Sequence, residues 1–237
     1  MKTKYVFLFV AAILFANVNN NAQAAEPSLL FKTPVTYGYN FGLATEAGQF
    51  NDEIGLFLGA KGSIVFNHQF SIGVAGYGQM SNHRLKGYSQ EIYTWGYNDT
   101  TYKYEKLTKQ DSSWYINGMG YGGLVLEYIF NPEDILHFTG SLFIGGGNLK
   151  YTRDLKDNSN NNMYYYEVDD YYYEYDRKES DFFVLEPAVN AELNLTSMIK
   201  IDFGVSYRSI SFVNLPATTN KQLSGFQGQL SFKFGSY

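Results

Sequence analysis

The sequence contains no cysteine, and this absence excludes a disulfide framework, thiol catalysis and cysteine-ligated metal sites together. Histidine occurs three times and proline five times in 237 residues, and only 17% of residues are charged. Beyond the first 24 residues there is no long uninterrupted apolar run, so the rest of the chain offers no candidate membrane-spanning helix. Insertion into a membrane would therefore have to use strands.

The N-terminus has the pattern of an export signal. Lys2 and Lys4 precede an apolar run from Tyr5 to Phe15, and Ala22-Gln23-Ala24 supplies small residues for cleavage. The apolar run is shorter than the roughly 20 residues that a transmembrane helix needs. We therefore predict a signal peptide at residues 1–24 and one domain at residues 25–237.

The predicted mature chain is acidic. Without Lys2 and Lys4, 16 basic residues remain against 23 acidic ones, a formal net charge of −7. A basic surface for nucleic acid is absent, so no nucleic-acid partner is expected.

Apolar residues recur at every second position in eight segments, which is typical of strands with two different faces. These segments are Val35 to Ala44, Glu53 to Phe66, Gln69 to Gln79, Trp114 to Phe130, Ile135 to Tyr151, Asp181 to Leu195, Ile199 to Phe212 and Leu223 to Phe234.

Short and long connections alternate between the strands. The short ones are residues 67–68, 131–134 and 196–198, and the long ones are residues 46–52, 81–113, 152–180 and 214–222. Short periplasmic turns and long extracellular loops are typical of an outer-membrane barrel. An even strand number places both termini on the periplasmic side.

The two faces of the strands differ in polarity. One face is apolar, as in Phe203, Val205 and Tyr207, whereas the other carries small or polar residues and few charges in the first three strands. A water-exposed surface normally has about 25–35% charged residues. Aromatic residues also cluster beside the short turns, where an aromatic girdle is expected. These features predict that the apolar face contacts lipid.

The same alternation predicts a charged lumen with four groups of each sign. The predicted lumen residues are Lys61, Glu127, Glu186, Glu192, Lys200, Asp202, Arg208 and Lys233. The interior of an eight-stranded barrel is just wide enough for side chains to fill it, and buried charges need partners. We expect a polar plug; a gated or proton-conducting path is the alternative.

The chain resembles the small outer-membrane barrels of the OmpA/OmpX type over the whole predicted mature chain. The resemblance rests on the strand pattern and on the glycine-rich phrases at residues 118–123 and 144–147. It implies an all-β, eight-stranded antiparallel up-and-down transmembrane β-barrel with long extracellular loops in the bacterial outer membrane. A monomer surrounded by outer-membrane lipid is expected. The C-terminal assembly signal stays open between Phe234 and Tyr237.

Two loops are rich in tyrosine, which offers a large contact area with a polar tip and suits recognition of an extracellular protein or glycan. Ordinary cross-strand pairing in hairpins is the alternative. The acidic residues among these tyrosines lack the spacing of an EF-hand, so we expect no metal and no cofactor. The predicted recognition residues are Tyr93, Trp95, Tyr97, Tyr164, Tyr165, Tyr166, Tyr171, Tyr172 and Tyr173.

We expect a structural or surface-binding protein with no catalytic residues. The alternatives are a small-solute porin and an enzyme at the extracellular rim that acts on lipid or peptide. A rim cluster in which His83 approaches serine and acid side chains would favour the enzyme. His137 is expected to be a hydrogen-bonded lumen residue. Pro187 lies inside a predicted strand, where we expect a β-bulge.

Overall fold

The computed structural model describes residues 34–51, 53–85, 92–98, 101–109, 113–154 and 179–236. The predicted signal peptide lies outside these ranges and stays a prediction. Within them, no helix has the length and apolar character needed to cross a bilayer.

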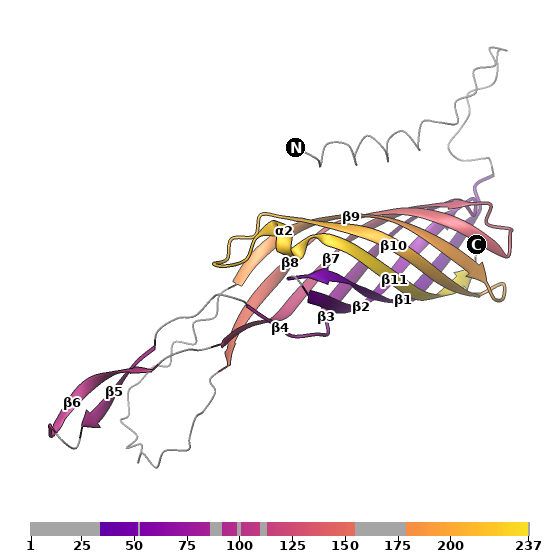
Figure 1. The fold of residues 1–237 in the computed structure, drawn as a ribbon. Coiled ribbons are helices and arrows are strands. Elements are labelled where there is room, and N and C mark those ends of the chain that lie inside the picture. Colours follow the sequence, from indigo (N-terminus) through magenta and orange to yellow (C-terminus); the bar gives the residue numbers. More distant parts are fainter. Residues whose placement is uncertain are drawn as a thin grey trace. The chain divides into compact units, whose positions relative to one another are not determined.

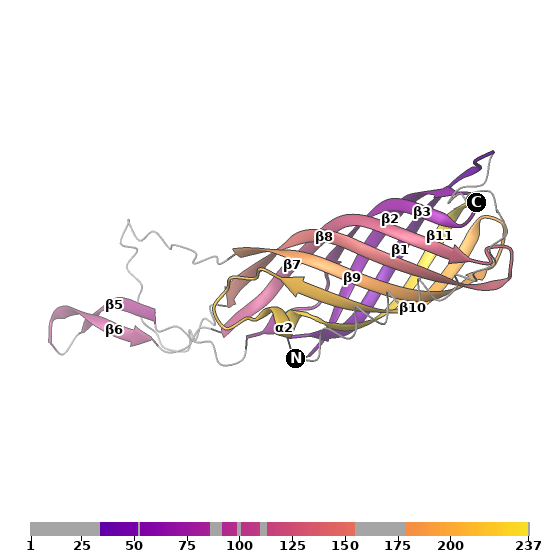
Figure 2. The ribbon, with the colours of Figure 1, turned by 90° about the horizontal axis from the view of Figure 1, so that it is seen from above.

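Residues Pro34–Tyr237 contain a closed antiparallel β-barrel (Figure 1). Each strand pairs with its neighbours in chain order, β1 pairs with β11, and β3 pairs with β7. The strands cross the barrel at a tilt, visible from above in Figure 2. The predicted all-β, eight-stranded antiparallel barrel is therefore confirmed, whereas the long extracellular loops stay a prediction. The barrel strands are β1 (Tyr37–Phe50), β2 (Glu53–Phe66), β3 (Phe70–Gln79), β7 (Ser113–Phe130), β8 (Leu136–Asp154), β9 (Glu179–Asn194), β10 (Ile199–Ser211) and β11 (Gly225–Ser236).

Three shorter strands and one helical turn lie in the connections. β4 (His83–Arg84) pairs with β7, and β5 (Ile92–Asn98) pairs with β6 (Lys103–Lys109) in a separate hairpin. The helical turn α2 (Asn220–Leu223) begins after Thr219, which forms a capping box with Gln222.

The connection between β1 and β2 differs from the prediction. A loop was expected at residues 46–52, but β1 continues to Phe50 and only Asn51 and Asp52 connect the strands. Asn51 adopts φ 50, a conformation that asparagine tolerates, and its N–H donates to Gln222 O at 2.7 Å. Glu46, at the start of the expected loop, is a buried lumen residue of β1.

The predicted bulge at Pro187 is wrong. Pro187 pairs with Leu142 of β8, and the register of β9 against β10 is the same on both sides of it. On the side of β10, the paired residues of β9 pass from Ala188 directly to Leu185. Pro187 lies in this gap, and the strand thereby accommodates a residue without an N–H. A register shift occurs instead in β7, between Ile116 and Gly118.

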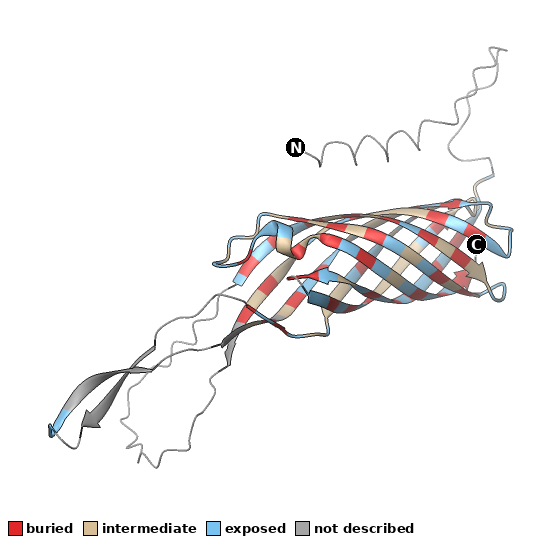
Figure 3. Ribbon diagram, viewed as in Figure 1, coloured by how far each residue is buried: buried red, intermediate tan, exposed pale blue. Residues whose placement is uncertain are grey.

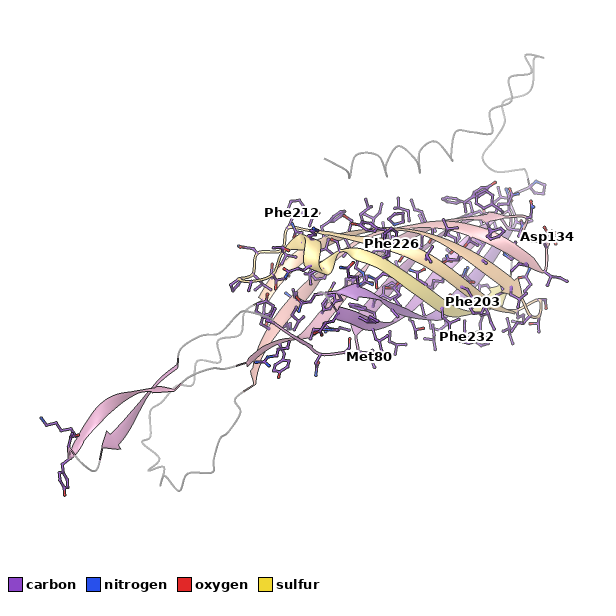
Figure 4. The ribbon with its side chains drawn as sticks, in the orientation of Figure 1. Met80, Asp134, Phe203, Phe212, Phe226 and Phe232 are labelled. Atoms are coloured by element: carbon purple, nitrogen blue, oxygen red, sulfur yellow. The ribbon has the colours of Figure 1, made fainter. Side chains whose placement is uncertain are left out.

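Exposed and buried residues alternate along the strands (Figure 3). The exposed positions are the apolar ones, as predicted, and include Phe203, Phe226 and Phe232, whose side chains are drawn in Figure 4. The outer surface is thus apolar and the lumen holds the polar groups, which is the reverse of a water-soluble barrel.

Candidate functional sites in the lumen and at the rim

Six of the predicted lumen residues form one cluster towards the short turns, which we call the turn-side charge cluster. Its centre is Lys233, whose Nζ lies 2.5 Å from Glu192 Oε2, 2.8 Å from Asp202 Oδ2 and 3.3 Å from Glu127 Oε1. Lys233 is fully buried. The other basic members are Lys61 and Lys200, so three lysines face three carboxylates.

The outer contacts of this cluster complete the pairing. Lys61 Nζ lies 3.4 Å from Asp202 Oδ2 and 3.6 Å from Glu127 Oε2, and Lys200 Nζ lies 3.8 Å from a Glu192 oxygen. His137 Nε2 lies 3.2 Å from Glu192 Oε1. These short distances inside a closed barrel supply the partners that buried charges require.

Arg208 organises a second group, the loop-side charge cluster. Its Nη2 lies 2.5 Å from Glu46 Oε2, and its Nε lies 3.2 Å from Glu186 Oε2. Gln229 Nε2 donates to Glu46 and Glu186 at 3.1 and 3.3 Å, and Tyr121 OH donates to Glu46 at 2.8 Å. Two carboxylates therefore share one guanidinium and several neutral donors.

Arg208 also connects this cluster to aromatic side chains. Its Nη1 has no hydrogen-bond partner within the described ranges, while its Cζ lies 4.2 Å from the ring centre of Phe57 and 4.9 Å from that of Tyr121. A guanidinium over an aromatic face gains a cation–π interaction, which is strongest when desolvated.

Apolar side chains fill the lumen beyond Arg208, towards the long loops. We call this group the apolar cap. Leu223 of α2 is fully buried in it, so the helical turn contributes to closing the barrel. Its other members include Phe50, Phe57, Leu85, Ile116, Met119, Leu149, Tyr151, Phe182, Val184 and Ile210.

A small cavity lies between the two charge clusters. Its volume is about 30 Å³, and its lining includes Lys61, Glu46 and Glu186. This is room for about two water molecules. The lumen therefore consists of two charged layers around a small cavity and an apolar layer towards the loops.

The structure places all eight predicted lumen residues inside the barrel, divided between two clusters. Sequence reasoning missed Glu46, because residues 46–52 were assigned to a loop. The signal was present, since Glu46 continues the alternation of Asn40, Gly42 and Ala44 along β1.

A third polar group lies at the end of the barrel that carries the long connections. Ser81 Oγ lies 2.7 Å from His83 Nε2, and His83 Nδ1 lies 3.1 Å from Glu53 Oε2. The His83 side chain is 3% exposed, whereas that of Glu53 is 40% exposed. We call these three residues the rim cluster. It is the arrangement that the sequence analysis had identified as favouring a rim enzyme.

The predicted recognition residues are only partly covered. Tyr93, Trp95 and Tyr97 belong to β5, whose backbone alone is described. The remaining ones, Tyr164 to Tyr166 and Tyr171 to Tyr173, lie outside the described residues. Their role in recognition stays a prediction.

Solved structures similar to this chain include bacterial outer-membrane and surface proteins. The N-terminal β-barrel domain of Pseudomonas aeruginosa OprF is 6% identical, with a TM-score of 0.47, and the alignment covers 84% of this chain and 96% of that one. Neisserial surface protein A is 11% identical, with a TM-score of 0.44 and coverage of 85% and 97%. Ail, the attachment invasion locus protein of Yersinia pestis, is 12% identical, with a TM-score of 0.39 and coverage of 84% and 97%.

No protein-family model matches the chain, and no curated protein sequence matches it. The similarity to these barrels therefore concerns architecture alone. The eight-stranded barrel itself is established by the strand pairing of this chain.

Proposed function

We propose that the protein is a non-conducting outer-membrane barrel whose function resides in the loops it presents at the cell surface. The observation that carries this proposal is the filled lumen. Lys233 and Arg208 each bridge carboxylates from different strands, and the apolar cap follows them towards the loops. An ion crossing the barrel would have to break both charged layers and enter an apolar one, which is costly.

The outer surface supports placement in a bilayer. Aromatic pairs lie near both ends, with Tyr128 and Phe130 at 4.8 Å near the turns and Tyr207 and Phe226 at 5.1 Å near the loops. Phe226 and Phe234 are both exposed on β11 and eight residues apart. That separation is about 26 Å along the strand, or about 20 Å along the axis at a tilt of about 40°. This height is close to the apolar band of known outer-membrane barrels.

For the loops, we propose binding of an extracellular protein or glycan. Tyrosine side chains provide large contact area with little loss of conformational entropy and a hydroxyl for hydrogen bonding. The carboxylates between them disfavour sulfated or phosphorylated ligands and favour neutral glycans or basic protein surfaces.

Single-cysteine labelling tests the location and orientation. Because the chain has no cysteine, one introduced thiol gives an unambiguous signal. We expect a membrane-impermeant maleimide to label Tyr166→Cys on intact cells, and to label His68→Cys only after the outer membrane is permeabilised. Labelling of His68→Cys on intact cells at the rate of Tyr166→Cys would reverse the orientation and refute the proposal.

Single-channel conductance tests whether the lumen is closed to ions. We expect no single-channel steps in planar bilayers from the unmutated protein, nor from Lys200→Ala or Glu192→Ala, because the loop-side cluster and the apolar cap remain in both variants. Steady conducting steps from the unmutated protein would make transport the leading function.

Replacing the predicted loop tyrosines with serine tests recognition. The variant changes Tyr164 to Tyr166 and Tyr171 to Tyr173, and the probe is an array of neutral and sulfated glycans together with a set of basic peptides. We expect the unmutated protein to bind neutral glycans or basic peptides and the variant to lose at least 10-fold in affinity. Binding that is unchanged in the variant would contradict a role for these tyrosines.

A further inference from the structure

We propose that the rim cluster of Ser81, His83 and Glu53 is a serine-hydrolase site that cleaves esters of apolar acyl chains. This activity would be additional to the loop function and does not depend on it.

The geometry is that of a nucleophile, a base and an orienting acid. Ser81 Oγ is 2.7 Å from His83 Nε2, and Glu53 Oε2 is 3.1 Å from His83 Nδ1. Both distances lie within the range of catalytic nucleophile–base and base–acid contacts. A carboxylate at Nδ1 holds the proton on that nitrogen, so the lone pair of Nε2 faces the serine hydroxyl.

Three separate elements hold these side chains in position. Glu53 begins β2, Ser81 follows β3, and His83 lies in β4, where it pairs with Ile116 of β7. The His83 ring packs edge to face on Phe50, with ring centres 4.9 Å apart. The base is thus fixed by packing and by its hydrogen bonds, which catalysis requires of an orienting scaffold.

The segment that carries Ser81 is also anchored. Met80 N donates to Leu56 O at 2.8 Å, and Leu56 N donates to Ser81 Oγ at 3.0 Å. On the other side of His83, Asn51 Nδ2 donates to Arg84 O at 3.2 Å. Ser81 is partly exposed, and hydrogen bonds to Leu56 and His83 hold its hydroxyl in place.

The surface beside the cluster indicates the substrate class. Met80 is 66% exposed and Ile54 is 73% exposed, and these residues adjoin Ser81 and Glu53 in the chain. A shallow hollow of about 500 Å³ at the same end is lined by Glu53, Ile54 and residues 47–49. Exposed apolar side chains next to a nucleophile suit an acyl chain at the boundary between bilayer and water.

The reaction balances with water as the only co-substrate. Ser81 Oγ bonds to the ester carbonyl carbon while its proton passes to His83 Nε2. The bond from that carbon to the alcohol oxygen then breaks, and the alcohol leaves with the proton. Water attacks the acyl-serine, its proton passes to Nε2 and on to Ser81 Oγ, and the fatty acid is released.

A covalent probe tests the site on the full-length mature protein folded in detergent. We expect a long-chain alkyl fluorophosphonate to modify Ser81, located by peptide mass spectrometry. Labelling should be lost in Ser81→Ala and should fall on the order of 10²-fold in His83→Gln, because the base is missing. Ser197→Ala, in an exposed turn at the opposite end, should label like the unmutated protein.

A second measurement guards against variants that disturb the loop. Ser81→Cys keeps a side chain of similar shape. Its thiol should react with iodoacetamide at least 10-fold faster than the same thiol in Ser81→Cys/His83→Gln, because an imidazole that accepts the thiol proton favours the thiolate. Equal rates would show that His83 does not act on residue 81, and would overturn the proposal.

Two substrates distinguish hydrolysis of a lipid ester from hydrolysis of a soluble ester. Phospholipid in mixed micelles and a soluble p-nitrophenyl butyrate are compared in the unmutated protein and in Ser81→Ala. Faster release from phospholipid that depends on Ser81 supports the lipid ester. A folded, unmutated protein that neither labels at Ser81 nor hydrolyses either ester would leave the cluster a structural anchor of the rim and refute the proposal.

Discussion

Lys233 is the residue on which the turn-side charge cluster most depends. Its Nζ contacts three carboxylates at 2.5, 2.8 and 3.3 Å. Lys233→Met would leave two lysines, Lys61 and Lys200, facing the three carboxylates, so one buried negative charge loses its compensating lysine. Breaking a buried pair from one side costs about 3–5 kcal/mol, and we expect this decrease in the free energy of unfolding.

A double-mutant cycle separates this charge effect from lost packing. Glu192→Gln removes the carboxylate nearest to Lys233, so Lys233→Met/Glu192→Gln restores the balance of two lysines and two carboxylates. The double variant should be more stable than the sum of the single effects by about 1–3 kcal/mol. Denaturant titration in detergent measures the free energy of unfolding of the unmutated protein, the two single variants and the double variant. Folding is checked on gels, where an unheated, folded barrel migrates faster than the unfolded chain.

Lys221→Met is the matched control for the loss of a lysine. Lys221 lies exposed on α2, and its replacement should change stability by less than about 0.5 kcal/mol. Strict additivity of the Lys233 and Glu192 effects would show that the two charges do not stabilise each other, and would refute the assignment of Lys233 as the centre of the cluster.

Two further predictions concern packing. Leu223→Ala should lower the free energy of unfolding by about 2–5 kcal/mol in the same titration, because this side chain is fully buried in the apolar cap. A decrease below about 1 kcal/mol would mean that α2 does not close the lumen. Gly123→Ala should reduce the yield of folded barrel, since its Cβ would lie 2.3 Å from Ile144 O. A Cβ at Gly78 meets nothing within 4 Å among the described residues, so Gly78→Ala should fold normally. Equal yields from the two glycine variants would contradict this reading.

Much of the barrel could be predicted because strand alternation is a local property of the chain. Residues two apart share a face, so Phe203 and Val205 fall outside and Asp202 and Arg208 inside without knowledge of their neighbours. The eight strands and the opposite faces follow from this period. The error at Glu46 arose because a polar residue near a strand end resembles a loop residue, although the alternation of Asn40, Gly42 and Ala44 continues through it.

Which charges meet was decided by the closure and register of the barrel. Lys233 reaches Glu127 because β11 faces β7 across the lumen, 106 residues away in sequence. In the rim cluster, the pairing of β2 with β3 brings Ser81 to β2, and the pairing of β4 with β7 holds His83 beside it.

The sequence by itself determined the strand period and the polarity of each face, because these depend on residues near one another in the chain. The tertiary structure alone decided the two separate charge clusters, the apolar cap and the Ser81–His83–Glu53 contacts. The two charge clusters and the apolar cap depend on strand register and ring closure, which bring together side chains that are distant in the sequence. The rim cluster needs the pairing of β2 with β3, which brings the neighbouring residues Ser81 and His83 to Glu53.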